Sequence, residues 1–466
     1  MPENFDVIVI GAGPAGYVAA IRAAQLKQKV AIVDKQWLGG VCLNVGCIPS
    51  KSLLKNAEVA HILRERGKEF GFSMDNLKLD YSVAVKRSRQ NSDRLTKGVG
   101  FLMKKNNIAV FMGEAHLTRP NIVSVKDKDG KLTELTAKNI IVATGASAAV
   151  PSAWKVDGQK VVTYMEAILQ TTLPKSVVII GSGAIGVEFA TVWNSYGVDV
   201  TIVEMLPRLV PLEDEEVSAE LKKAFDKRGI KSLTGHKVES VEATATGVKV
   251  KVSAEGKTTS LEADQALVAI GFRPNSKGLG LEEVGVKISE RGFVEINEKM
   301  QTNVAGIWAI GDVTGKLMLA HVGSAMGIIC AENIAGAETI TLDYEMMPRA
   351  TYCQPQIASF GLTEAQAKER GHAVKIGRFP FQANGKALGM GDYAGWVKLV
   401  MDEKYGEILG AHMIGPEVTE LLPELTLAHM MELTPHEIAR NVHAHPTLSE
   451  VLMEAAHAAS GTPIHM

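Results

Sequence analysis

The chain of 466 residues is long enough for about three domains, and its composition, 46% hydrophobic and 22% charged, is typical of a globular protein. Fifty Lys and Arg side chains are balanced by 52 Asp and Glu, with no basic block, so neither nucleic acid nor an anionic membrane is an expected partner. No apolar stretch approaches the ~18 residues that span a bilayer. The first residues lack the pattern of a secretory signal, which makes a cytoplasmic location the expectation.

A short apolar strand at residues 7–10 opens directly onto a glycine loop. The loop carries the three glycines of a G-x-G-x-x-G fingerprint, Gly11, Gly13 and Gly16. An alanine-rich helix over residues 17–25 is expected next, and a strand at 30–34 then ends in Asp34, 23 positions after the first glycine. Together these elements form a mononucleotide-binding unit, in which the loop meets a pyrophosphate and the acid a ribose.

A second copy of this arrangement begins with the apolar strand at residues 177–180. Its fingerprint glycines are Gly181, Gly183 and Gly186. A helix through Glu188 follows, and the strand at 200–204 ends in Glu204, again 23 positions after the first glycine. One such fingerprint is a weak signal, but two copies with the same spacing predict sites for two adenine dinucleotides.

Glu204 also predicts which nicotinamide cofactor the second unit binds. A carboxylate at the ribose repels the 2′-phosphate of NADP, which requires arginine instead, so NAD is favoured. Arg208 is a counter-argument, although Pro207 before it indicates a chain that is turning away. Val238 and Gly271 are further candidate contacts of this cofactor.

Three apolar runs, at residues 139–145, 266–271 and 306–312, are each expected to form a strand that ends at a glycine. The first, with Thr144 and Gly145 at its end, and the second would complete the two nucleotide units. The third predicts that the chain returns to the first domain after the second is complete. Asp312 ends this run at the carboxyl end of a strand, where ligands of open α/β sheets collect; a buried helix cap explains it equally well.

The remaining segments carry no evident chemistry. Residues 79–106 predict a long polar helix, and residues 237–261 alternate as antiparallel strands do. From about residue 343 the glycine fingerprints cease. Four strand candidates follow, at 350–352, 357–360, 396–400 and 407–412, and helices close the chain. This pattern predicts a third, mixed α/β domain without a nucleotide site of its own.

Cys42 and Cys47 form a C-x4-C turn soon after the first nucleotide unit. Zinc is disfavoured, because this is not a common zinc spacing and further ligands are missing nearby, so no metal is expected. A packed pair of unreactive thiols is one interpretation. The other interpretation is a redox pair. Gly46 and Pro49 indicate a bent backbone at a helix entrance, and a helix N-terminus lowers the pKa of a thiol and so favours the thiolate. Cys47 is better placed for this effect than Cys42. The remaining two cysteines, Cys330 and Cys353, fit the core.

A histidine near the C-terminus is a candidate base for thiol chemistry, since the ordinary pKa of histidine lies near neutral pH. His445 has Glu450 as its nearest candidate carboxylate, which would hold the ring as in a catalytic triad. Residues 447–450 also have the pattern of a capping box, which is the favoured explanation of Glu450 from the pattern alone. His445 itself, directly before Pro446, is equally explained as a surface histidine.

The chain resembles the class I pyridine nucleotide-disulfide oxidoreductases nearly end to end. The resemblance depends on the two glycine fingerprints, the Cys42–Cys47 turn and the histidine-containing segment at residues 443–450 taken together. The most specific motifs lie at residues 39–51 (GGVCLNVGCIPSK), 306–312, 318–321 and 443–450. The resemblance implies an α/β fold with two Rossmann-like dinucleotide-binding domains and a C-terminal mixed α/β dimerisation domain. The implied boundaries are an FAD-binding domain at 1–147 and 274–345, an NAD-binding domain at 148–273 and an interface domain at 346–466.

The resemblance also implies roles for single residues. Cys42 and Cys47 would form a redox disulfide, with Cys42 toward the substrate and Cys47 toward the flavin. Lys51 and Glu188 would pair near the flavin. The other residues implied to contact FAD are Gly11, Gly13, Gly16, Asp34, Ala115, Thr144, Gly145, Asp312 and Ala320.

His445 would be the base, supported by Glu450 and supplied by the other subunit of a homodimer. The implied activity is reoxidation of protein-bound dihydrolipoamide to lipoamide with NAD⁺, as in 2-oxo acid dehydrogenase complexes. A substrate thiolate would attack Cys42 and release Cys47, and electrons would then pass through the flavin to NAD. The implied partners are lipoyl-bearing acyltransferase subunits or the carrier protein of glycine cleavage.

Three alternatives remain. A glutathione-reductase-like activity is opposed by Glu204, and a mercuric-reductase-like activity by the lack of a cysteine pair in residues 461–466. A redox-silent nucleotide-binding scaffold is opposed by the complete set of Cys42, Cys47, Lys51 and His445.

Three positions depart from the commonest pattern of the family. Asp34 stands in place of glutamate, Val41 in place of threonine and Ala115 in place of glycine. These departures affect only the detail of the FAD contacts.

Overall fold

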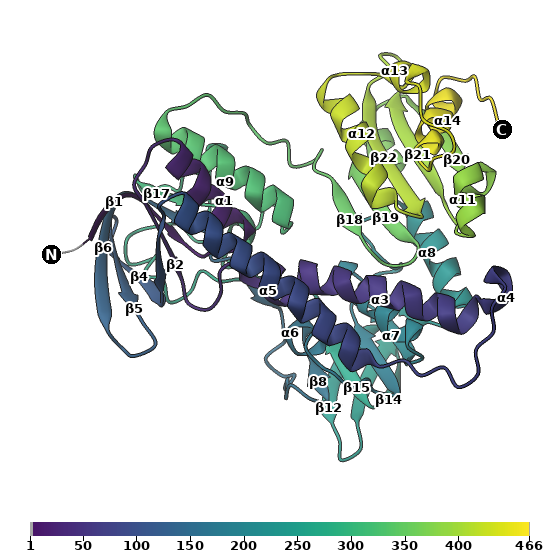
Figure 1. Ribbon diagram of the computed structural model, residues 1–466, viewed down its shortest axis with the longest axis horizontal. Coiled ribbons are helices and arrows are strands. Elements are labelled where there is room, and N and C mark those ends of the chain that lie inside the picture. Colours follow the sequence, from purple (N-terminus) through teal and green to yellow (C-terminus); the bar gives the residue numbers. More distant parts are fainter. Residues whose placement is uncertain (1–2, 466) are drawn as a thin grey trace. The chain divides into compact units, whose positions relative to one another are not determined.

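The computed structural model describes residues 3–465 (Figure 1). They divide into two compact units. Unit 1 holds the described residues of Met1–Ser52, Val83–Ala149 and Gly271–Tyr344, and unit 2 holds those of Leu53–Ser82, Val150–Ile270 and Glu345–Met466. Each unit is therefore assembled from three separate stretches of the chain.

Unit 1 is built on a parallel sheet. In spatial order its parallel strands are β3 (Ala109–Met112), β2 (Val30–Asp34), β1 (Glu3–Ile10), β6 (Leu132–Val142) and β17 (Ile307–Ala309). The apolar runs of β1 and β2 are almost entirely buried, as expected for strands covered on both faces. Because β17 pairs with β6, the chain does return to the first sheet, as the run at 306–312 predicts.

An antiparallel meander extends the same sheet. It consists of β4 (Glu114–Arg119), β5 (Ile122–Lys126) and the first half of β6. Leu117 and Val125 of the meander share a buried core with Ile8 and Ile140 of the parallel strands. A two-stranded ribbon, β7 (Ala146–Ala148) with β16 (Phe272–Pro274), joins the points where the chain leaves and re-enters the unit.

Two helices of unit 1, α1 (Pro14–Gln25) and α9 (Ala320–Ala335), lie side by side in Figure 1. Their backbones approach closely, because a Cβ on Gly327 would lie 2.6 Å from the carbonyl oxygen of Ala15. The cysteine turn lies on α2 (Gly40–Val45) and the start of α3 (Cys47–Glu65). The polar helix expected at 79–106 is α5 (Tyr81–Lys105).

The nucleotide-binding part of unit 2 repeats the plan of unit 1. Its parallel sheet has the order β11 (Lys231–Thr234), β10 (Asp199–Glu204), β9 (Ser176–Ile180), β15 (Gln265–Val268) and β8 (Val161–Val162). The helices α7 (Ala184–Ser195) and α8 (Glu215–Lys227) follow β9 and β10. The strands expected at 237–261 form the antiparallel meander β12 (Lys237–Ala243), β13 (Val248–Ala254) and β14 (Lys257–Ala263).

The C-terminal part of unit 2 is an antiparallel sheet covered by helices. The strand order is β18 (Arg349–Thr351), β19 (Gln356–Gly361), β22 (Ile408–Gly415), β21 (Trp396–Asp402) and β20 (Val374–Pro380). The main helices are α12 (Val418–Met430), α13 (Pro435–Arg440) and α14 (Glu450–Ala459), whose apolar faces share the core of the sheet. The four strand candidates are found here, whereas β20, most of whose residues are only half-buried, is an addition.

The remaining elements are short. They are the helices α4 (Gly67–Phe70), α6 (Tyr164–Ala167), α10 (Glu364–Glu369) and α11 (Gly385–Met390) and the 3₁₀ turns η1 (Gly311–Thr314) and η2 (Phe381–Ala383).

Candidate active site

The first and third glycines of each fingerprint are required by the packing of the chain itself. Gly11 and Gly181 have φ angles of +105° and +102°, which side chains rarely adopt. A Cβ on Gly16 would lie 1.8 Å from the carbonyl oxygen of Gly11, and one on Gly186 would lie 2.0 Å from that of Gly181. These four glycines allow the strand, the turn and the helix to meet.

The middle glycines, Gly13 and Gly183, are not required by packing, because a Cβ at either position would not clash with any described protein atom. The nearest atom to a Cβ on Gly13 would be the Cα of Gly40, at 4.0 Å, and none lies within 4 Å of one on Gly183. Each is the N-cap of its helix and has no side-chain cap. The bare backbone and the unused N–H groups of the first helical turn therefore fit the pyrophosphate of a dinucleotide at both loops.

The acids at the ends of β2 and β10 hold these loops in place. Asp34 accepts hydrogen bonds from the backbone N–H of Ala12 at 2.7 Å, and from those of Gln36 and Trp37 at 2.8 and 2.9 Å. Glu204 accepts from the N–H and the hydroxyl of Ser182 at 2.9 and 2.8 Å and from the N–H of Leu206 at 2.8 Å. The predicted ribose contacts would use the acceptor capacity that remains, since a carboxylate has about four lone-pair sites.

The guanidinium group of Arg208 is bound by residues that follow it in the chain. Its guanidinium forms an ion pair with Glu215 and donates to the carbonyl oxygen of Pro211 at 3.3 Å. The counter-argument that Arg208 raised against NAD is weakened, because this cation already has an acidic partner.

Thr144 and Gly145 are tied to the segment that re-enters unit 1. The hydroxyl of Thr144 donates to the carbonyl oxygen of Asn275 at 2.7 Å, and the Asn275 amide donates back to the carbonyl oxygen of Thr144 at 3.0 Å. Gly145 and Gly271 have φ angles of +70° and +116°, and no described protein atom lies within 4 Å of the place that a Cβ would take on either residue. These turns are open to a ligand on their side-chain faces.

Asp312 lies at the start of η1, beside the first glycine loop. A Cβ on the adjacent Gly311 would come within 3.0 Å of the Cβ of Ala15 in α1. Burial raises the pKa of Asp312 to about 6, and within residues 3–465 its carboxyl group is not a hydrogen-bond partner of any side chain or backbone group. The helix-cap explanation thus has no bond to support it, whereas a half-buried carboxyl group without a protein partner fits a bound hydroxyl-rich group.

Three other residues were predicted to contact a cofactor, and they differ in what they offer to a ligand. Ala320 is the first residue of α9, so its N–H belongs to an uncapped helix end. Ala115 and Val238 are half-buried and pack their side chains against the cores of unit 1 and unit 2. A cofactor contact at Ala115 or Val238 would therefore involve the backbone more than the side chain.

Cys42 lies in α2, and Cys47 is the first residue of α3; both are free thiols that are neither fully buried nor fully exposed. The two thiols are hydrogen-bonded to each other, and this bond, with burial, raises the pKa of Cys42, while the charge of Lys51 acts to lower it. The turn therefore places the sulfurs in direct contact and the cation of Lys51 beside them. If the two thiols were only an unreactive packed pair, there would be no reason for a lysine ammonium group beside them.

Glu188 is buried in α7 of unit 2. Its carboxylate accepts a hydrogen bond from the backbone N–H of Tyr352 at 3.0 Å. Lys51 belongs to unit 1, so its pairing with Glu188 stays a prediction.

His445 and Glu450 are brought together in unit 2. The Nδ1 atom of His445 lies 2.9 Å from Oε1 of Glu450, and the Oε2 atom accepts from the N–H of Thr447 at 2.8 Å. Burial acts to raise the pKa of Glu450, but these two hydrogen bonds outweigh it and hold the pKa below its ordinary value. The capping box is only half formed, because α14 begins at Glu450, after Ser449, and within residues 3–465 the Thr447 hydroxyl oxygen accepts no backbone N–H of the helix; its proton is donated to the carbonyl oxygen of Ala444.

Two neighbours of the site were missed from the sequence. The Nε2 atom of His443 lies 2.9 Å from Glu424, a second His–Glu pair beside the first. Asn44, between the two cysteines, is buried and hydrogen-bonded to the carbonyl oxygens of Leu38 and Gly40. A polar residue between two cysteines was the available signal for Asn44, whereas no local pattern links residues 424 and 443.

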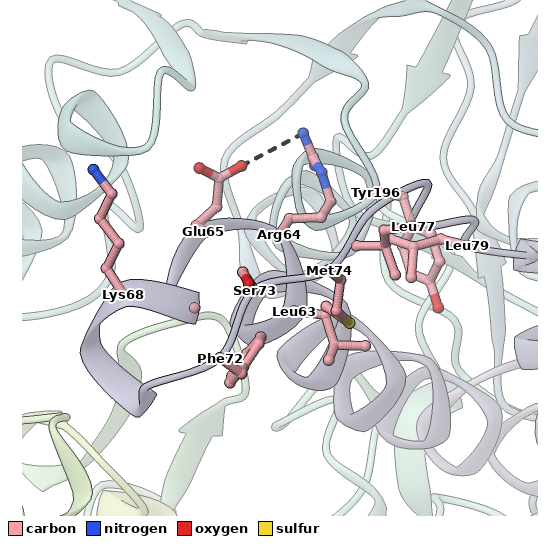
Figure 2. Close-up of a pocket in the computed structure, with 11 residues that line it drawn as sticks. Leu63, Arg64, Glu65, Lys68, Phe72, Ser73, Met74, Leu77, Leu79 and Tyr196 are labelled. Atoms are coloured by element: carbon pink, nitrogen blue, oxygen red, sulfur yellow. Dashed lines mark ion pairs between the residues drawn. The ribbon is translucent and has the colours of Figure 1, made fainter.

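A surface pocket in unit 2 contains none of the predicted site residues. It has a volume of about 800 Å³ and is lined by the end of α3, the start of α4, the loop after α4 and Tyr196. Figure 2 shows Arg64 directed toward Glu65 at its edge, with Leu77 and Leu79 beside Tyr196. Within residues 3–465 no group of three or more His, Cys, Asp or Glu side chains is arranged to hold a metal ion.

Two family models match the chain. The model described as pyridine nucleotide-disulphide oxidoreductase matches residues 5–327, and the model of the dimerisation domain of the same proteins matches residues 347–456. The chain belongs to the pyridine nucleotide-disulphide oxidoreductase family. It is therefore an oxidoreductase with a dimerisation domain, and membership implies a flavin and a nicotinamide cofactor.

Curated relatives match over the full length. Proteins named dihydrolipoyl dehydrogenase are 54% identical in Mycobacterium leprae, with 99% of both chains covered, and 51% identical in Corynebacterium glutamicum, with 100% of both covered. The protein of that name from Bacillus subtilis is 42% identical, again with 100% of both chains covered.

Solved structures show the same fold. The chain is similar to LpdA from Mycobacterium tuberculosis, with a TM-score of 0.91, 27% identity and 97% and 99% of the two chains covered. It is also similar to the flavoprotein disulfide reductase RclA from Escherichia coli, with a TM-score of 0.88, 25% identity and coverage of 98% and 99%.

These comparisons confirm the predicted family, the α/β fold class with its dimerisation domain and the classification as an enzyme. None of the helices in the part of the chain that the structure describes is long and apolar enough to cross a membrane.

Proposed function

We propose that the chain is a dihydrolipoyl dehydrogenase, which oxidises protein-bound dihydrolipoamide to lipoamide and reduces NAD⁺. The observation that carries the proposal is the hydrogen-bonded pair of Cys42 and Cys47 at the entrance of α3, in the unit that also holds the first glycine loop. Full-length relatives of this name at 42% to 54% identity support the same activity.

The two sulfurs would have unequal roles. In the oxidised enzyme they form a disulfide, and a substrate thiolate attacks the sulfur of Cys42, so that the Cys42–Cys47 bond breaks and Cys47 leaves as a thiolate. The second substrate thiol then displaces Cys42 as its bond to the substrate breaks, which gives lipoamide and a reduced cysteine pair. Cys47 has the position for the leaving thiolate, since the N-terminus of α3 stabilises negative charge there.

A bound flavin would supply an acceptor for the two electrons of the cysteine pair and pass them as hydride to the nicotinamide. We assign FAD to the loop of Gly11, Gly13 and Gly16, with Asp34 and Asp312 toward its hydroxyl groups. The free carboxyl group of Asp312 supports this assignment. Lys51, on α3, and Glu188, on α7, would pair beside the flavin.

NAD is assigned to the loop of Gly181, Gly183 and Gly186, with Glu204 at the ribose. The ion pair of Arg208 with Glu215 supports NAD over NADP, because a 2′-phosphate would meet the carboxylate of Glu204 without a free cation beside it.

A homodimer would complete the site. His445 is the proposed base, and its side chain is 78% exposed in the single subunit, although it is already paired with Glu450. Large apolar side chains are also exposed on and after α12, as expected for a face that a second subunit covers; they are Leu427, Met430, Met431 and Val442. We propose that His445 of one subunit serves Cys42 of the other.

The proposed domains are an FAD-binding domain at residues 1–147 and 274–345, an NAD-binding domain at 148–273 and an interface domain at 346–466. The proposed partners are lipoyl-bearing acyltransferase subunits of 2-oxo acid dehydrogenase complexes or the carrier of glycine cleavage, and the proposed location is the cytoplasm.

An anaerobic titration tests the function. Dihydrolipoamide is added to the purified yellow protein and NAD⁺ follows, while absorbance is recorded from 300 to about 700 nm, the range of flavin and flavin–thiolate absorption. The expected result is a long-wavelength band after dihydrolipoamide, and its loss with formation of NADH after NAD⁺. A spectrum that dihydrolipoamide leaves unchanged would refute the proposal.

A further inference from the structure

Asn44 lies between the two redox cysteines, on the short helix α2, and is only 8% exposed. Its amide nitrogen donates to the carbonyl oxygens of Leu38, at 3.0 Å, and Gly40, at 2.8 Å. Its side-chain oxygen accepts from the hydroxyl of Thr96, on α5, at 3.4 Å. All the polar atoms of this buried amide are therefore used to fix α2.

Arg89, also on α5, binds the same residue from another direction. Its guanidinium donates to the backbone carbonyl oxygen of Asn44. This oxygen belongs to the last turn of α2, whose carbonyl groups have no partner within the helix. A cation at this end of α2 also compensates the partial negative charge of the helix terminus. Asn44 lies two residues before Gly46 and three before Cys47.

A second attachment follows just after the cysteine turn. The hydroxyl of the buried Ser52, on α3, accepts from Arg87 and from Asn91, both at 3.0 Å. The four side chains Arg87, Arg89, Asn91 and Thr96 thus connect α5 to both sides of the Cys42–Cys47 turn, and all of these contacts lie within unit 1. We call this set the α5 clamp.

We propose that the α5 clamp, through Arg89 and Thr96, sets the geometry in which Cys42 and Cys47 exchange their disulfide, so that Arg89 is a positioning residue for the thiol half of the reaction. A disulfide forms only within a narrow range of Cα separations. The helix α2 has only six residues, too few to be stable by themselves, so its position depends on its buried side chains Leu43 and Val45 and on the polar contacts with α5. The proposal rests on the proposed function, since it assigns Arg89 to the redox step of that reaction.

The test compares two activities of the same holoenzyme. Oxidation of dihydrolipoamide by NAD⁺ requires the cysteine pair, whereas reduction of ferricyanide by NADH requires the cofactor sites but no thiol exchange. In Arg89→Met we expect the first activity to fall at least about tenfold at saturating substrate, because small misplacements of reacting groups are costly, and the second to stay within about twofold. Thr96→Val should lower the first activity by a smaller factor, and Arg89→Lys should recover part of it.

Arg94→Met is the matched control, because Arg94 is an exposed arginine of the same helix. It should leave both activities unchanged. A parallel loss of both activities in Arg89→Met and Thr96→Val would show a merely structural role, and unchanged activity in both variants would show that the clamp is irrelevant; either result overturns the proposal.

A third measurement separates this proposal from the proposed function. The rate at which dithiothreitol reduces the Cys42–Cys47 disulfide is followed by thiol labelling, and it does not depend on the natural substrate. If the native protein fails to oxidise dihydrolipoamide, the proposed function is wrong, and a reduction rate that is lower in Arg89→Met but not in Arg94→Met still supports the clamp. Equal rates in the native protein and Arg89→Met would overturn it.

Discussion

The imidazole of His445 and the carboxylate of Glu450 are 2.9 Å apart, and the other oxygen of the carboxylate is held by the N–H of Thr447. The acid is thereby fixed at the start of α14 while the ring remains largely exposed. An anchored carboxylate next to an exposed imidazole is compatible with the proposed role of His445 as a base that acts on Cys42 of a second subunit.

His445→Gln should therefore lower turnover of dihydrolipoamide by about a hundredfold or more, the range for loss of a general base. FAD content and NADH-dependent ferricyanide reduction should be retained. Glu450→Gln keeps an oxygen for the Thr447 N–H and should cause a smaller loss. Steady-state assays of both variants provide the measurement, and near-normal turnover in His445→Gln would make this residue structural.

The cysteine pair gives a second prediction, which distinguishes the two sulfurs. Cys42→Ser should leave Cys47 able to form a long-wavelength charge-transfer band with oxidised flavin, because Cys47 lies at the N-terminus of α3. Cys47→Ser should lack this band. Both variants should lose dihydrolipoamide oxidation almost completely. Absorption spectra at several pH values provide the measurement, and the reverse pattern would exchange the two roles.

The sequence predicted the elements of this site that depend on local spacing. Both glycine loops, the acids at positions 34 and 204, and the helix entrance at Cys47 follow from short patterns, and the structure has these elements in the expected places. The return of β17 to the first sheet was also predictable, because an apolar run ending at a glycine marks a buried parallel strand.

Contacts between distant parts of the chain were not predictable in this way. Arg89 lies 45 residues from Asn44, and Tyr352 lies 164 residues from Glu188. Nothing in the local pattern around either residue specifies its partner, since these contacts are made only when separate elements pack. The capping box at residues 447–450 is a local pattern that the structure forms only in part. Glu450 does accept from the N–H of Thr447, but the helix begins only at Glu450, so the Thr447 hydroxyl does not cap it.

Cofactor choice gives a third prediction, centred on Glu204. The native enzyme should strongly prefer NADH to NADPH, because the 2′-phosphate of NADPH would be repelled by Glu204 while Arg208 is paired with Glu215. Glu204→Gln removes the charge but keeps an oxygen for the N–H of Ser182, and should reduce the preference by about tenfold, equivalent to ~1.4 kcal/mol.

The measurement is the ratio of kcat/KM for the two cofactors in ferricyanide reduction. Glu215→Gln, which releases Arg208 without touching the loop, should reduce the preference less than Glu204→Gln does. Comparable turnover with both cofactors in the native enzyme would contradict the assignment of NAD.

The half-buried carboxyl group of Asp312 should make the stability of the FAD-free protein depend on pH. Its pKa is raised to about 6 by burial, above the 3.8 of an exposed carboxyl group. Between pH 3.8 and about 6 the carboxyl group is therefore protonated in the folded state and ionised in the unfolded state. Stability should therefore fall as the pH rises from about 4 to about 6, and the cost should be fully present above that, about 3 kcal/mol at 1.36 kcal/mol per pKa unit.

Asp312→Asn cannot ionise, so the FAD-free variant should be more stable than the FAD-free native protein at pH 7.5, with a difference that shrinks toward pH 4.5. Thermal unfolding of both proteins at equal concentration and at these two pH values is the measurement. Asp129→Asn, at an exposed position of the same unit, is the control and should show no such trend. With FAD bound the order should reverse, because the carboxylate then has hydroxyl partners that asparagine binds less well. A stability difference that is the same at pH 4.5 and 7.5 would show that Asp312 is not the group that titrates.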